Sequence, residues 1–91
     1  DAINVFSTDG RLKQYSLKVL VDDKNFFPSY YCATLIREET LKKYPELKKV
    51  LAMLDGKISN EEMTSMNYMV EIEKKDPKEV AIDFLEKKGL K

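Results

Sequence analysis

The feature that most constrains the fold is a change of sequence pattern near residue 37. Before this point, short stretches alternate apolar and polar side chains, as half-buried strands do. After it, apolar side chains recur at helical spacing, and helix start and stop signals follow one another. The pattern therefore predicts an α/β chain, with about three short strands followed by about four helices.

The first part of the chain contains three predicted strands, at residues 3–6, 17–21 and 32–36. A turn at residues 8–10 separates the first two, and Gly10 is free to take a positive φ there. Residues 26–31 form a predicted loop rich in aromatic side chains. Pro28 excludes this stretch from a central strand, because proline has no N–H to donate.

The second part begins with two short predicted helices. The first starts near Leu41 and ends before Pro45, because the residue that precedes a proline is disfavoured in the α region. The second starts at Pro45, since a proline is well tolerated as the first helical residue. Gly56 is its predicted stop.

Two further predicted helices carry complete start signals. Ser59 and Glu62 have the spacing of a capping box, in which each side chain accepts a hydrogen bond from the other residue's backbone N–H. Asp76 followed by Pro77 repeats the signal, with Asp as the cap and Pro as the first helical residue. Gly89 is the predicted stop of the last helix.

Length and charge exclude several classes of protein. The chain has 91 residues and so holds one domain at most. It carries 16 basic and 16 acidic residues, and this balance argues against a nucleic-acid partner, which needs a basic surplus. No stretch approaches the roughly 20 apolar residues of a membrane span. The chain opens in strand-like sequence without an initiator methionine, so we expect it to be part of a longer protein.

Side chains for catalysis or metal binding are scarce. Histidine is absent, which excludes a Ser-His or Cys-His nucleophile pair and a histidine-based zinc site. Cys32 is the single cysteine and is expected to be a small buried hydrophobe. Asp9, Asp22 and Asp23 lack the ligand alternation of a calcium loop and are most simply solvated turn residues. We therefore expect no enzyme, no catalytic residues, no metal site and no cofactor.

Aromatic residues are concentrated in one place. Four of the nine lie within six positions, namely Phe26, Phe27, Tyr30 and Tyr31. Ring faces attract cations, and a quaternary ammonium suits them because it has no N–H to donate. The alternative is a loop anchored by core-filling rings, which composition alone favours because buried aromatics are common.

Seven stretches in a fixed order carry a resemblance to a known family. They are residues 6–11 (FSTDGR), 20–30 (LVDDKNFFPSY), 36–41 (IREETL), 44–47 (YPEL), 54–59 (LDGKIS), 66–68 (MNY) and 77–85 (PKEVAIDFL). The chain resembles the glycine betaine/carnitine/choline-binding proteins of ABC osmoprotectant importers over essentially its whole length. The resemblance implies the C-terminal part of a two-lobed, periplasmic-binding-protein-like fold of type II.

The resemblance also implies that residues 1–91 are a single fragment of a substrate-binding domain, with two parts. Residues 1–30 would supply second-lobe and hinge strands with the aromatic loop. Residues 31–91 would supply a crossing strand and the C-terminal helices of the first lobe. Exposed apolar edges of such a fragment lead us to expect homodimerisation or strand exchange.

The ligand site is likewise implied by the resemblance. In the family an aromatic cage holds a trimethylammonium group, and the matching positions here are Phe6 and Tyr30. Thr8, Asp9 and Tyr31 are weaker candidates. The family usually has Tyr where this chain has Phe6, and Phe keeps the π face while losing the hydroxyl. The chain also departs from the family's Pro-Tyr-Asp-Ala-Ala-Pro pattern around the second ring. The remaining cage groups belong to another part of the family's proteins.

The implied function is capture of a quaternary-ammonium compatible solute (glycine betaine, choline or carnitine) for delivery to an ABC permease. The implied location is extracytoplasmic and membrane-associated, as a lipoprotein, a periplasmic protein or a fusion to the permease. The alternative is a small stand-alone α/β interaction domain. Such a domain would hold a protein partner with its Met- and Phe-bearing faces, including Met63, Met66 and Met69.

Overall fold

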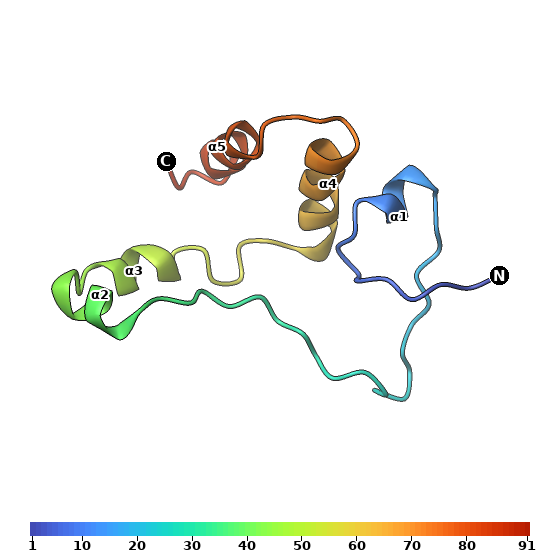
Figure 1. The fold of residues 1–91 in the computed structure, drawn as a ribbon, viewed down its shortest axis with the longest axis horizontal. Helices are drawn as coiled ribbons and strands as arrows, with labels where there is room; N and C mark the ends of the chain where they lie inside the picture. The colour runs from blue at the N-terminus through green and yellow to red at the C-terminus, as the bar shows by residue number, and fades with distance from the viewer. The chain divides into compact units, whose positions relative to one another are not determined.

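The computed structural model describes residues 1–91 and contains five helices (Figure 1). They are α1 (Arg11–Gln14), α2 (Glu38–Lys43), α3 (Leu47–Ala52), α4 (Asn60–Glu71) and α5 (Pro77–Lys87). The chain divides into two compact units, which are described separately below. The first unit combines Asp1–Val19 with Gly56–Lys91, and the second is Leu20–Asp55.

The prediction of three strands is wrong, because the structure contains no strand. Residues 3–6, 17–21 and 32–36 have no regular secondary structure. Apolar alternation describes one segment, whereas a strand exists only when its N–H and C=O groups pair with a neighbouring segment. No such ladder forms here, so the expected α/β class is corrected to helices joined by irregular segments. The expectation of strand exchange is therefore not supported, because the structure has no strand to exchange.

The four helices predicted after residue 37 are confirmed, with shifts at their ends. Helix α2 begins at Glu38, earlier than expected, and ends at Lys43, before the Tyr44–Pro45 pair that disfavours helix. Helix α3 begins at Leu47 instead of Pro45 and ends at Ala52, four residues before its predicted stop at Gly56. Gly56 and Gly89 adopt φ values of 66° and 68°, in the left-handed region that glycine enters without steric cost.

Helices α4 and α5 begin at the predicted caps. At α4, Ser59 Oγ accepts from Glu62 N at 3.2 Å, and Glu62 Oε2 accepts from Ser59 N at 3.0 Å. At α5, Asp76 Oδ1 accepts from the backbone N–H groups of Lys78 and Glu79 at 2.9 and 3.2 Å. These bonds satisfy N–H groups that have no partner inside the helix.

Helix α1 was not predicted. It occupies one turn directly after Gly10, where the sequence indicates a turn between strands. Gly10 has φ −60°, so the predicted positive φ is wrong at this position. Leu12 on this helix is one of the two buried hydrophobic residues, and Val80 on α5 is the other.

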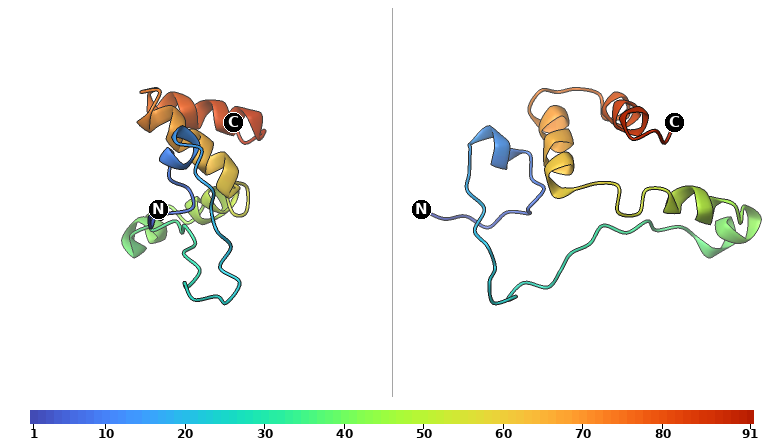
Figure 2. Two further views of the ribbon diagram at one scale, coloured as in Figure 1. Left: turned by 90° about the vertical axis from the view of Figure 1, so that its right-hand side faces the viewer. Right: turned by 180° about the vertical axis from the view of Figure 1, so that it is seen from behind.

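The core of the first unit is small and centres on α4. Helices α1 and α5 both contact α4, and the two views of Figure 2 show both beside it. A salt bridge of 2.6 Å joins Lys88 Nζ, just after α5, to Glu62 Oε1 on α4. The second unit contains α2 and α3, together with the irregular segment of residues 20–36.

Candidate functional site

The first candidate ring belongs to the Phe6 loop, defined here as residues 6–10. The carbonyl of Phe6 accepts a hydrogen bond from Asp9 N at 3.0 Å, which closes a turn. The side chain of Phe6 takes no part in a core, since the residue is 76% exposed. The backbone is therefore folded locally, while the ring is exposed.

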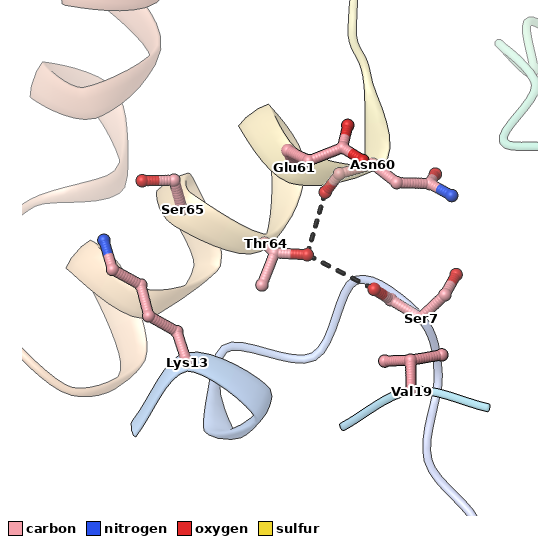
Figure 3. A pocket seen from close by; sticks show the side chains of 7 residues that line it. All are labelled: Ser7, Lys13, Val19, Asn60, Glu61, Thr64 and Ser65. Carbon is pink, nitrogen blue, oxygen red and sulfur yellow. Dashed lines mark hydrogen bonds between the residues drawn. The ribbon is translucent and has the colours of Figure 1, made fainter. Parts of the chain in front are cut away.

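The next two carbonyls of the Phe6 loop accept hydrogen bonds from α4. Asn67 Nδ2 donates to Thr8 O at 2.7 Å. Thr64 Oγ1 donates to Ser7 O at 3.2 Å and to Asn60 O, in its own helix, at 2.8 Å (Figure 3). A hydroxyl has one proton, so the longer Ser7 contact is the weaker of the two. Asn67 thus makes the stronger bond from α4 to this loop.

Gly10 allows the loop to come this close to the helix. A Cβ at this position would lie 2.8 Å from Tyr68 N and 3.0 Å from Asn67 C, too near for a side chain. The sequence indicates a turn at Gly10 but not this close approach, because the helix backbone that Gly10 meets lies 57 or more positions away.

Asp9 is engaged by Arg11 on both carboxylate oxygens. Oδ1 accepts from Arg11 N at 2.9 Å and Nε at 3.0 Å, and Oδ2 accepts from a guanidinium nitrogen at 2.6 Å. These bonds favour the ionised form and lower the pKa of Asp9 from 3.8 to about 2. Its side chain is 12% exposed. The carboxylate therefore stabilises the turn, and its predicted ligand contact remains a prediction.

The second candidate ring belongs to the aromatic loop, residues 26–31, in the second unit. Asp22 Oδ2 accepts from Phe27 N at 2.9 Å, and Asn25 takes a φ of 50° between them. The backbone N–H groups of Phe27, Phe26 and Lys24 lower the pKa of the Asp22 carboxyl. Asp22 was interpreted as a solvated turn residue, and its bond to the aromatic loop was missed. The signal was Asn25, a residue type that tolerates positive φ.

The aromatic side chains of this loop are exposed. Phe26 and Phe27 contact each other edge to face, with ring centroids 5.1 Å apart and planes at 86°. Tyr30 and Tyr31 are 78% and 89% exposed. These exposed side chains do not fit the alternative of rings that fill a core. Phe6 lies in the first unit and Tyr30 in the second, so their pairing around one ligand remains a prediction.

A separate pocket of about 410 Å³ lies within the first unit (Figure 3). Lys13 points along one side of it, with Nζ 4.8 Å from the centre of the Tyr68 ring. None of the predicted site residues line the pocket, and no sequence signal marked it. It is lined by Ser7, Lys13, Val19, Asn60, Glu61, Thr64 and Ser65.

Other chemistry is sparse. The chain has no group of three or more His, Cys, Asp or Glu side chains arranged to hold a metal ion. Cys32 is exposed, which corrects the expectation of a buried thiol. None of the five helices has both the length and the apolar character that crossing a membrane requires.

Comparison with known proteins identifies the family to which the chain is similar. The model of a family described as the substrate binding domain of an ABC-type glycine betaine transport system matches residues 1–87. A Helicobacter pylori ergothioneine transport permease/ergothioneine binding protein is 54% identical over 90 residues, which is 99% of this chain and 16% of that protein.

Two further relatives carry related names. A carnitine transport binding protein of Listeria monocytogenes is 51% identical over 82 residues, or 90% of this chain and 27% of the relative. A glycine-betaine-binding protein of Pseudomonas aeruginosa is 39% identical over 79 residues, or 87% of this chain and 25% of the relative. The chain thus spans between 16% and 27% of the length of these three relatives. They are binding and transport proteins and not enzymes. The chain belongs to the family of substrate-binding domains of ABC-type glycine betaine transport systems.

Proposed function

We propose that this chain forms part of the substrate-binding component of an ABC importer for quaternary-ammonium compatible solutes. The family match over residues 1–87 carries this proposal. The partner would be an ABC permease, and the site of action would be outside the cytoplasm. The match also accounts for nearly the whole chain, so the alternative of a stand-alone interaction domain is not needed.

The proposed ligand carries a trimethylammonium group. The names of three relatives refer to ergothioneine, carnitine and glycine betaine. These three solutes share a trimethylammonium group and a carboxylate, whereas choline shares only the first. The common group is the one that aromatic rings recognise, because its charge is spread over methyl surfaces that meet the π face.

Phe6 and Tyr30 are proposed to supply two of the ring faces. Both rings are mostly exposed, at 76% and 78%. The backbone after Phe6 is stabilised by the hydrogen bond from Asn67 to Thr8 O, and the backbone before Tyr30 by the hydrogen bond from Phe27 N to Asp22. A cation over such a ring contributes about 0.5–2 kcal/mol, depending on how fully water is excluded. Thr8, Asp9 and Tyr31 remain weaker candidates beside these rings.

The test is calorimetry on the full gene product that carries this sequence, with glycine betaine, carnitine, choline and ergothioneine as ligands. Tyr30→Ala and Phe6→Ala should each weaken binding by about twofold to thirtyfold, the range that one ring contributes. Phe6→Tyr should be tolerated, since it keeps the ring face.

Two controls make the test specific. Tyr15→Ala removes another exposed ring, outside both loops, and should leave affinity within about twofold. Neutral analogues with a tert-butyl group in place of trimethylammonium should bind much more weakly than the cations. Unchanged affinity in both ring variants, or equal binding of the neutral analogues, would contradict the proposal.

A further inference from the structure

We propose that Asn67 is a positioning residue for ligand binding, which holds the backbone of the Phe6 loop on α4 and so sets the direction of the Phe6 ring. The inference rests on the proposed role of Phe6 as a ligand contact. It concerns a residue on a helix that carries none of the predicted site residues.

The contact that carries the inference is long-range and partly buried. Asn67 Nδ2 donates to Thr8 O at 2.7 Å across 59 positions of the chain. Thr8 is two residues after Phe6, and Phe6 O is itself bonded to Asp9 N at 3.0 Å. Asn67 therefore holds the middle of the turn that begins at Phe6.

Close packing reinforces this bond. The loop reaches Asn67 because Gly10 lies against the backbone of α4, where a Cβ would lie 3.0 Å from Asn67 C. Thr64, one turn before Asn67, adds its weaker contact to Ser7 O at 3.2 Å. Phe6, Ser7 and Thr8 thus have three successive carbonyls that each accept a hydrogen bond.

The Phe6 side chain needs such support. Its residue is 76% exposed, so no core packing fixes where the ring points. The backbone sets where the side chain begins and so restricts the positions that the ring can reach. A ring held in place before the ligand arrives loses less conformational freedom on binding, which raises affinity.

The helix does not depend on Asn67 for its own stability. Helix α4 begins at the Ser59–Glu62 capping box and contacts α1 and α5, the helices that carry the buried Leu12 and Val80. Removing the amide of Asn67 should therefore leave α4 folded, so that a change of ligand affinity can be separated from unfolding of the helix.

The experiment is a double-mutant cycle between Asn67→Ala and Phe6→Ala in the full gene product. Calorimetry with glycine betaine, carnitine, choline and ergothioneine measures affinity, and thermal melting measures stability. Asn67→Ala should weaken binding by up to about tenfold and by no more than Phe6→Ala does, because Asn67 acts only through the position of that ring. In the Phe6→Ala background the same change should weaken binding less than about twofold, because the ring on which it acts is gone.

Two further variants keep the result clear. Asn67→Asp preserves the shape of the side chain but removes the N–H donor, so it should weaken binding as Asn67→Ala does even if the alanine variant folds poorly. Asn60→Ala changes another asparagine on α4 whose side chain makes no bond to the loop, and it should leave affinity unchanged.

The outcomes separate this inference from the proposed function. If Phe6→Ala and Tyr30→Ala both leave affinity unchanged, the proposed function fails, and the inference fails with it. If only Phe6→Ala leaves affinity unchanged, the inference fails while the proposed function still has the Tyr30 ring. If Phe6→Ala weakens binding but Asn67→Ala and Asn67→Asp do not, only the inference is overturned. Equal losses from Asn67→Ala in both backgrounds would show a general structural role and would also overturn it.

Discussion

At the residue scale, an aspartate holds the backbone beside each candidate ring. Asp9 accepts from Arg11 N at 2.9 Å in the Phe6 loop, and Asp22 accepts from Phe27 N at 2.9 Å before Tyr30. Both carboxylates have lowered pKa values, since hydrogen bonds favour the ionised form. Phe6 thus precedes, and Tyr30 follows, a turn that a carboxylate stabilises.

The stability of the Phe6 loop should depend on acid pH through Asp9. Its pKa is about 2 in the folded chain, against 3.8 for the free group. Because the folded value is lower, the contribution of Asp9 to stability is present above pH 3.8 and disappears as the pH falls toward 2. A carboxyl NMR titration should show a midpoint near 2 for Asp9.

The same titration tests whether Arg11 causes the low pKa of Asp9. Arg11→Met should bring the midpoint of Asp9 back toward 3.8, because it removes the guanidinium hydrogen bonds and keeps a side chain of similar length. Asp9→Asn should abolish the acid-dependent part of loop stability. A midpoint near 3.8 in the unchanged protein would contradict the role of this ion pair.

At the element scale, the two longest helices begin at side-chain caps and are joined by an ion pair. Glu62 has two roles, because one oxygen accepts from Ser59 N and the other binds Lys88 beyond α5. The Lys88 ammonium, followed by the Ser59 N–H, lowers the pKa of Glu62. The start of α4 is thereby connected to the end of α5 through one carboxylate.

The Asp76 cap offers a test of how α5 is stabilised. Asp76→Ala removes the acceptor of two backbone N–H groups and should lower the free energy of unfolding by about 1 kcal/mol. Hydrogen exchange at the amides of Lys78 and Glu79 should become faster. Asp83→Ala removes the same charge from the middle of α5 and should leave those amides protected. Equal exchange in both variants would show that the cap contributes little.

At the scale of the whole molecule, much apolar surface is left uncovered. The accessible area is 8391 Å², whereas a folded monomer of 10.6 kDa has about 5,500 Å². Only Leu12 and Val80 are buried among the hydrophobic residues. Large exposed side chains in the second unit include Leu20, Val21 and Leu35, at 78%, 88% and 95%.

This exposure predicts how residues 1–91 behave when they are produced by themselves. Unfolding should expose about 7,000 Å² instead of the roughly 10,000 Å² of a compact chain of this mass. The urea m-value scales with that area, so it should be about three tenths lower than for a compact protein of equal length. The chain should also bind a dye that senses apolar surface. A steep urea transition without dye binding would contradict the prediction.

The sequence by itself determined that helices follow residue 37, together with the caps of α4 and α5. The signals at Ser59 and Asp76 are local, because each cap bonds to N–H groups two or three residues away. Such bonds form wherever the chain is helical, whatever surrounds it. The resemblance that drew attention to Phe6 and Tyr30 was likewise contained in short stretches of sequence, and the family match confirmed the family while leaving those two residues as predictions.

Only the tertiary structure decided which segments meet. Strands could not be predicted from alternation in residues 3–6, because a strand requires a partner segment and none pairs with it here. The reason for Gly10 and the role of Asn67 both depend on contacts across more than 50 positions. Hydrogen bonds between near neighbours depend only on a short stretch of sequence. The close approach of distant backbone segments depends on how the whole chain packs.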